Sequence, residues 1–137
     1  MTRNGPRKRV DVDYWKGRLQ AARDYRQAAE DAIDLAEPEG NANPTISRIV
    51  LAAIAYADSL TAQRAQVVNQ QDHRRASRLL RDVLQNALPD AQERRLRQLI
   101  SRKDEVQYGA RRATFEEARR LLVDLDAFAQ WAEEQLT

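Results

Sequence analysis

Residues 114–136, TFEEARRLLVDLDAFAQWAEEQL, give the clearest indication of the fold. Their apolar side chains recur in alternating steps of three and four, which places them on one face of an α-helix. These side chains are Phe115, Ala118, Leu122, Leu125, Ala129, Ala132 and Leu136, with Leu121 and Phe128 beside them. Thr114 and Glu117 have the spacing of a capping box, so the helix is expected to begin there. A period near 3.5 residues favours near-parallel or antiparallel packing in a left-handed bundle.

Helix breakers divide the rest of the chain into four further helical segments. Pro and Gly lie at residues 37–44, 88–90 and 108–114, and a polar break lies at residues 69–72. The two shorter helices that meet at residues 88–90 are expected to form one wall together. Strand signals are nearly absent. The sequence therefore predicts an all-α, up-down helical bundle of four to five helices, with a single domain at residues 11–137 and a disordered basic tail at residues 1–10.

The second helical segment, which begins near residue 43, is the most apolar. Asn43 is a suitable N-cap, and Pro44 fits the first helical position. Its apolar stripe is so wide that it nearly encircles the helix, which indicates coverage on several sides or a subunit interface. Together with Trp15 and Trp131 as exposed aromatic candidates, this pattern favours a homodimer.

The composition excludes several classes of site. The 137 residues include no Cys and only one His, which excludes disulfides, a thiol nucleophile and His-rich or Cys-rich metal sites. No cofactor or metal is therefore expected. The longest uncharged apolar run, residues 49–57, is about half of a membrane span. The first dozen residues lack the apolar run of a signal peptide. We expect a cytoplasmic protein without membrane contact.

Five polar residues are candidates for catalytic chemistry: His73, Asp58, Arg64, Lys103 and Tyr108. The single imidazole, His73, follows the expected helix cap Asp72, where the helix dipole disfavours protonation. It is either a proton acceptor or a surface histidine at a loop–helix junction. Asp58 interrupts the most apolar segment and must be solvated, paired or hydrogen-bonded, in a buried ion pair or in a polar pocket. Arg64 is one candidate partner for Asp58, but six residues along one helix is a poor match, so a partner from another helix is expected.

Arginine is concentrated in the middle of the chain. Residues 72–112 carry eleven basic and six acidic residues, and 20 of the 23 basic residues of the chain are Arg. Such a face is either an ordinary solvated surface or an electrostatic site for nucleic acid. Aromatic residues are absent between residues 57 and 107, which argues against base stacking there. The nucleic-acid candidates are Arg74, Arg75, Arg78, Arg81, Arg94 and Arg95.

Several stretches together resemble small prokaryotic HEPN-like proteins. Over residues 43–135 these are I-x-x-I-V-L-A-A-I-A-Y-A-D-S-L, the Asp72–His73 pair after a polar loop, R-L-L, K-D-E-V-Q-Y-G and T-x-x-E-A-x-x-L-L. The resemblance implies a dimerising helical bundle of a defence or toxin–antitoxin type system, in which some members are ribonucleases. Those ribonucleases carry an Arg followed four to six residues later by His. Here residues 66–68 read Gln-Val-Val and the nearest preceding arginine is Arg64, so the resemblance implies a non-catalytic variant.

Three functions follow as alternatives from these patterns. The first is a non-catalytic interaction module, expected as a homodimer and with a possible partner protein. The second is a nucleic-acid-directed hydrolase, a ribonuclease centred on His73, which requires that the imidazole lie close to at least one other catalytic candidate. The third is an RNA-binding regulator that uses the arginine-rich middle of the chain.

Overall fold

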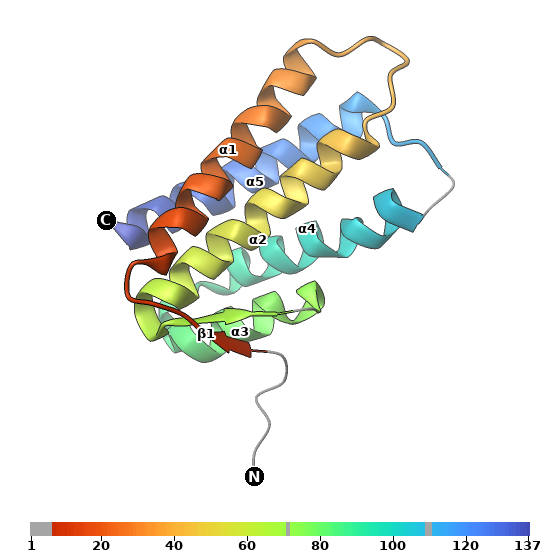
Figure 1. Cartoon of the computed structure of the whole chain (residues 1–137). Coiled ribbons are helices and arrows are strands. Elements are labelled where there is room, and N and C mark those ends of the chain that lie inside the picture. Colours follow the sequence, from red (N-terminus) through yellow and green to blue (C-terminus); the bar gives the residue numbers. More distant parts are fainter. Residues whose placement is uncertain (1–6, 71, 109–110) are drawn as a thin grey trace.

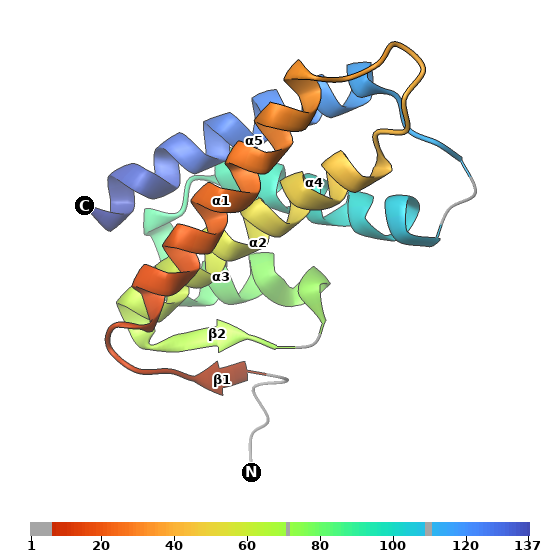
Figure 2. The same cartoon turned by 45° about the horizontal axis from the view of Figure 1, so that its top comes forward.

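The computed structural model describes residues 7–70, 72–108 and 111–137, except for the side chains of residues 107 and 108. Its long helices run alternately up and down (Figures 1 and 2), which confirms the predicted all-α bundle. The elements in chain order are β1 (Arg7–Arg9), α1 (Tyr14–Asp34), α2 (Asn43–Ala65), β2 (Val67–Asn69), η1 (His73–Arg75), α3 (Ala76–Leu84), η2 (Gln85–Ala87), α4 (Asp90–Tyr108) and α5 (Phe115–Leu136). The two η elements are single 3₁₀ turns.

Helix α2 runs through the centre of the bundle and packs against α1, α3, α4 and α5 (Figure 1). Fifteen of its 23 residues are buried, among them the large side chains of Ile46, Ile49, Tyr56 and Leu60. Its nearly all-round apolar pattern is therefore explained by coverage within one chain. By length and composition alone this helix could cross a membrane, but 83% of its most apolar window is buried in the bundle, as in the core helix of a globular domain.

The start of α2 differs from the prediction by one residue. Ala42 is the N-cap residue, and Pro44 lies in the first turn. The side chain of Asn43 does not cap its own helix but reaches the segment before α5. Its Oδ1 accepts a hydrogen bond from the backbone N–H of Ala113 at 2.9 Å, and its Nδ2 donates to the carbonyl of Arg111 at 3.3 Å. Asn43 thus ties together two connections that are far apart in the sequence.

Helix α5 confirms the apolar stripe that predicted it. The buried residues are Ala118, Leu121, Leu125, Phe128, Ala129, Ala132 and Leu136. Thr114 is the N-cap, and its Oγ1 accepts a hydrogen bond from the backbone N–H of Glu117 at 3.1 Å. The carboxylate of Glu117 binds the guanidinium of Arg111 at 2.8 Å instead of returning to Thr114. Only the hydroxyl half of the predicted capping box is therefore present.

Helices α3 and α4 do not share one wall, which corrects the prediction. Helix α4 has 19 residues and extends along the bundle, whereas α3 has nine and packs against α2, the neighbouring part of α4 and β2 at one end (Figure 2). The two are separated by η2, which begins at Gln85, a residue with a left-handed φ of 53°. A non-glycine residue in this region turns the chain sharply, so the break begins well before Pro89.

A short antiparallel ribbon joins the start of the chain to its middle, which corrects the prediction of a disordered tail for residues 7–10. Strand β1 pairs with β2, and Lys8 lies opposite Val68. Gln66, with a left-handed φ of 54°, ends α2 and directs the chain into β2. Arg7 forms an ion pair with Asp82 of α3 at 2.6 Å. The first six residues, the rest of the predicted tail, lie outside the described residues.

Candidate functional site

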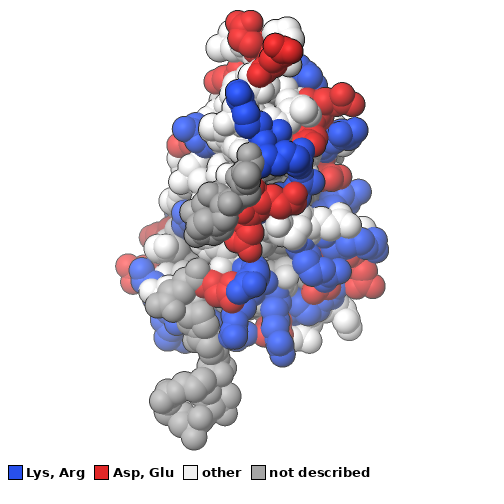
Figure 3. All heavy atoms as spheres, turned by 90° about the vertical axis from the view of Figure 1, so that its right-hand side faces the viewer, with Lys and Arg blue, Asp and Glu red and all other residues white. Residues whose placement is uncertain are grey.

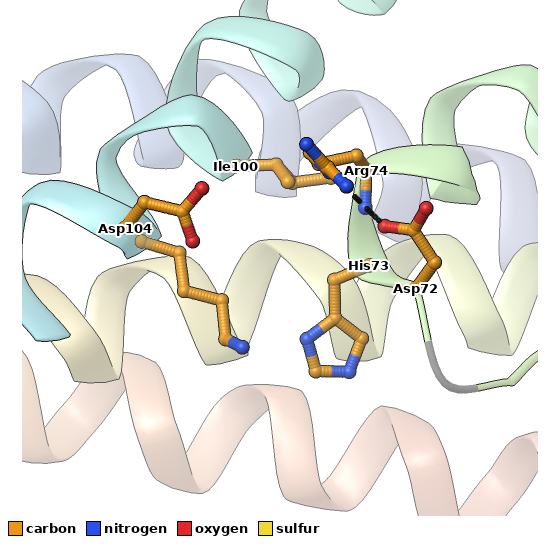
Figure 4. A pocket seen from close by; sticks show the side chains of 6 residues that line it. Asp72, His73, Arg74, Ile100 and Asp104 are labelled. Atoms are coloured by element: carbon orange, nitrogen blue, oxygen red, sulfur yellow. Dashed lines mark hydrogen bonds and ion pairs between the residues drawn. The ribbon is translucent and has the colours of Figure 1, made fainter. Parts of the chain in front are cut away.

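A polar pocket lies where η1 meets α4, and we call it the His73 pocket. Its volume is about 200 Å³, and its lining residues are Asp72, His73, Arg74, Ile100, Lys103 and Asp104 (Figure 4). Residues of η1 and α4 that are about 30 positions apart in the sequence thus share one cavity. Two of the catalytic candidates, His73 and Lys103, come together here, as does the nucleic-acid candidate Arg74.

The turn before His73 is fixed by the hydrogen bonds of Asp72. Its carboxylate accepts from the backbone N–H of Arg74 at 3.1 Å, which confirms the predicted cap. The same oxygen accepts from Nε of Arg74 at 3.2 Å, and the Asp72 carbonyl accepts from the Asn69 side chain at 2.8 Å. These bonds leave the Asp72 carboxylate and the His73 imidazole pointing in different directions (Figure 4). The imidazole is therefore directed by a rigid turn without being bonded to the carboxylate beside it.

The surroundings of the His73 imidazole favour its neutral form. Its burial lowers its pKa below the usual range, and the positive charges of Lys103 and Arg18 lower the pKa further, whereas Asp72 raises it. Nδ1 is buried without a hydrogen-bond partner among the described residues. A neutral imidazole carries its single proton on one ring nitrogen, so Nε2 can accept a proton only when Nδ1 carries the hydrogen. Burial and the neighbouring positive charges favour the neutral form of the imidazole.

Asp58 forms a buried ion pair with Arg18 of α1. The Asp58 residue is 8% exposed, and its Oδ2 lies 3.0 Å from Nη2 of Arg18. Burial raises the pKa of Asp58 to about 6, although Arg18 acts in the opposite direction. The prediction that Asp58 finds its partner on another helix is thus confirmed. Arg18 itself was missed, and its signal in the sequence is its place one helical turn before Ala22, on the stripe of α1 that faces the core.

Arg64 does not join this cluster in the described structure. Arg64 donates a hydrogen bond to the carbonyl of Gln135 at the end of α5, at 2.6 Å, and does not pair with Asp58. The side chain of Tyr108 lies outside the described residues. Within the described chain, His73 and Lys103 therefore both line the pocket, whereas Asp58 pairs with Arg18, which does not line it.

The nucleic-acid candidates fall into three groups. Arg74 and Arg75 pair with Asp72, and their side chains are largely exposed. Arg81 is occupied within the fold, because its guanidinium binds the carboxylates of Asp90 and Glu93 and the carbonyls of Gln85 and Leu88. The third group consists of Arg78, Arg94 and Arg95. Among the described residues, none of these three side chains has an acidic partner within 4 Å. Arg81 is therefore a structural residue that holds the α3–α4 connection.

One side of the molecule carries charges of both signs (Figure 3). Figure 3 shows basic side chains gathered over this side of the molecule, with acidic side chains interspersed among them. Arg111, for example, pairs with Glu117 at 2.8 Å. A continuous basic surface is therefore absent from this view. Individual pockets are better candidates for a binding site than the overall electrostatic field of this surface.

A second polar pocket, of about 360 Å³, lies between α1, α2 and α5. Its lining residues are Arg23, Arg26, Gln27, Glu30, Tyr56 and Glu133. Glu133 accepts bonds from both Arg23, at 2.9 and 2.5 Å, and the Tyr56 hydroxyl, at 3.1 Å. Arg26 binds Asp126 at 2.9 Å. Because its charged side chains are paired with one another, this pocket is a polar joint that fixes α1 and α5 to the central helix.

The fold and the site define the class as an all-α helical bundle with a polar pocket lined by a histidine whose buried Nδ1 has no hydrogen-bond partner among the described residues. In the part of the chain that the structure describes, no group of three or more His, Asp or Glu residues is placed to hold a metal ion. No family model matches the chain, and no curated protein matches it either.

Proposed function

We propose that the protein binds RNA phosphodiester groups in the His73 pocket and cleaves them with His73 as general base. The observation that supports this is the shared location of a neutral, partly exposed imidazole and the ammonium of Lys103 in one cavity. A proton acceptor for the attacking hydroxyl and a cation beside the phosphate are two groups that promote such a cleavage.

In this reaction the His73 imidazole accepts the proton of a ribose 2′-hydroxyl. The 2′-oxygen forms a bond to phosphorus, the bond from phosphorus to the 5′-oxygen breaks, and the departing 5′-oxygen takes a proton from solvent. Lys103 and Arg74 stabilise the negative charge that builds up on the phosphoryl oxygens. The Arg74 guanidinium, although held by Asp72, keeps further N–H groups for this purpose. The products are a 2′,3′-cyclic phosphate and a 5′-hydroxyl.

The test is cleavage of a single-stranded RNA oligomer, with the cyclic phosphate detected by mass spectrometry. We expect His73→Ala to lower the rate by about 100-fold or more, because general bases contribute at least that factor. Arg120→Gln is the matched control, since Arg120 lies on the exposed face of α5 and should not affect the rate. Cleavage that survives His73→Ala would refute the proposal. RNA that binds with steep salt dependence but stays intact would support the RNA-binding regulator instead.

Homodimeric association remains a prediction with less support than the sequence suggested. One of the two arguments for a homodimer was the wide apolar stripe of α2. The other helices of the same chain cover that stripe, so this argument no longer holds. Trp15 and Trp131, expected to be exposed, are half-buried against the core. The exposed large apolar side chains of the described residues, Val12, Leu35 and Val123, are separate, since the first two lie at opposite ends of α1. Light scattering at micromolar concentration tests association directly, and a mass of 15.7 kDa would exclude it.

A further inference from the structure

Helix α3 packs beside α4, and two contacts show which of their residues face each other. At the start of α3, the η1 turn meets α4 in the His73 pocket, which Arg74 and Ile100 both line. At the end of α3, the guanidinium of Arg81 binds the carboxylate of Glu93, in the first turn of α4, at 2.7 Å. The two helices therefore run in opposite directions, and we call the line that joins these two contacts the α3–α4 seam.

Arg78 lies on the α3 side of the seam, between the two contacts. It follows Arg74 by four residues and precedes Arg81 by three, so the three side chains share one face of the helix. The rise from Arg74 to Arg78 is about 6 Å along the helix axis. Arg78 is exposed. A basic group therefore stands on the surface one helical turn away from the His73 pocket.

Arg97 lies on the α4 side of the seam, also between the two contacts. It follows Glu93 by four residues and precedes Ile100 by three, so it shares a face of α4 with both of these residues. Arg97 is exposed as well. It was not among the nucleic-acid candidates, because spacing along one helix does not show which neighbouring helix a side chain faces. The packing of α3 beside α4 supplies that information.

The positive charges of Arg78 and Arg97 are available to a ligand. Among the described residues, neither side chain has an acidic partner within 4 Å. Glu93, at the far end of the seam, is already held in an ion pair. Asp104 places a negative charge at the pocket end, where Lys103 lines the same cavity and offsets it. The seam is thus a short row of cations that extends the pocket in one direction.

We propose that an RNA single strand lies along the α3–α4 seam, with one phosphodiester in the His73 pocket and neighbouring phosphates bound by Arg78 and Arg97. This inference rests on the proposed function and deepens it, because it defines the substrate as a strand of several nucleotides. The separation of Arg74 and Arg78 is similar to that of successive phosphates in an extended single strand. A strand is also required by the chemistry, since in-line attack by the 2′-hydroxyl needs a backbone that a duplex does not hold rigid.

Binding along the seam should depend on the backbone and not on the bases. Aromatic residues are absent between residues 57 and 107, so the seam offers no platform on which bases could stack. Arginine contacts to phosphates carry no sequence information. We therefore expect binding that strengthens with the length of the strand and weakens steeply with salt, without a marked preference for sequence.

The test is binding of a fluorescently labelled 2′-fluoro oligouridine octamer, measured by fluorescence anisotropy. This probe lacks the 2′-hydroxyl, so the protein cannot cleave it. We expect Arg78→Gln/Arg97→Gln to lower the affinity about tenfold or more in 0.1 M salt, and to reduce the slope of log K against log salt by about 0.7 for each lost phosphate contact. Arg78→Lys/Arg97→Lys keeps both charges and should retain most of the affinity.

The matched control is Arg119→Gln/Arg120→Gln, which removes two exposed charges from α5. Helix α5 lies on the other side of α2 from α3 (Figures 1 and 2). An equal loss of affinity in both double variants, or a loss in neither, overturns the inference. So does a wild-type protein that does not bind the octamer in 0.05 M salt, or one that binds a fluorinated duplex of the same length more tightly.

The binding assay and the cleavage assay separate this inference from the proposed function. Binding of the octamer that depends on Arg78 and Arg97, together with ordinary RNA that stays intact, would remove the proposed cleavage and retain the path of the strand. Cleavage that depends on His73 but is unchanged in Arg78→Gln/Arg97→Gln would retain the proposed function and overturn the path.

Discussion

Replacing Asp58 with Asn should change how the stability of the protein depends on pH. Burial raises the pKa of Asp58 to about 6, against an ordinary value of 3.8. The folded state therefore binds more protons than the unfolded state between these two values, and the free energy of unfolding falls as the pH rises through 6. The full difference of about two pKa units corresponds to about 3 kcal/mol, and about 2 kcal/mol of it lies between pH 4.5 and 7.5.

The assay is urea unfolding at several pH values between 4.5 and 7.5, with wild type and variant compared at each pH. The comparison is needed because Glu133 and Glu117 have pKa values lowered by Arg23 and Arg111, and they stabilise the fold increasingly as the pH rises through their ordinary value of 4.5, at the low end of this window. We expect Asp58→Asn to gain about 2 kcal/mol relative to wild type from the lowest to the highest pH. Asp82→Asn, at a half-exposed ion pair, serves as the control and should change by less than about 1 kcal/mol. A difference between Asp58→Asn and wild type that stays constant or shrinks with pH would refute the reasoning.

Three further predictions concern the scaffold. Thr114→Val removes the hydroxyl cap of α5 and should cost about 1 kcal/mol of stability, measured by urea unfolding. Phe128→Ala empties a fully buried position and should cost about 3–5 kcal/mol, whereas Val123→Ala on the same helix, at a 68% exposed position, should change stability by less than about 0.5 kcal/mol. Arg7→Gln breaks the ion pair to Asp82 and should cost less than about 1 kcal/mol, since both partners contact water; a drop in melting temperature as large as that of Phe128→Ala would contradict this.

The regular helices could be predicted from the sequence, because their apolar spacing is set by the same faces that the core buries. In α5 the buried side chains follow the predicted stripe, with Leu121 facing the core more fully than Leu122. The β1–β2 ribbon could not be predicted in this way. Three-residue strands are too short to show a period of two, and the partners lie about 60 residues apart. The path of α3 across the end of the bundle depends on Gln85, whose left-handed φ no simple sequence rule anticipates.

The candidate site could be predicted only in part. His73 attracted attention as the single imidazole, and Asp58 as a charge in an apolar helix, because both are chemically unusual at their positions. Lys103 shares a cavity with His73 because α4 packs beside η1. The spacing of residues along the chain does not predict this packing. Arg18 was not among the residues that the sequence singled out. A charged residue on the buried stripe of one helix, matched by an opposite charge on the next, is the signal that would have identified it.

The central position of α2 has a consequence for how the molecule comes apart. Each of the other four α-helices buries its apolar face against this one, so no subset of helices holds a hydrophobic core that excludes it. Partial opening that frees one helix must uncover part of the centre, and the chain should therefore unfold in a single cooperative step. Amide hydrogens in the middle of α2, around Ala53 and Tyr56, should then exchange with solvent only when the whole domain unfolds.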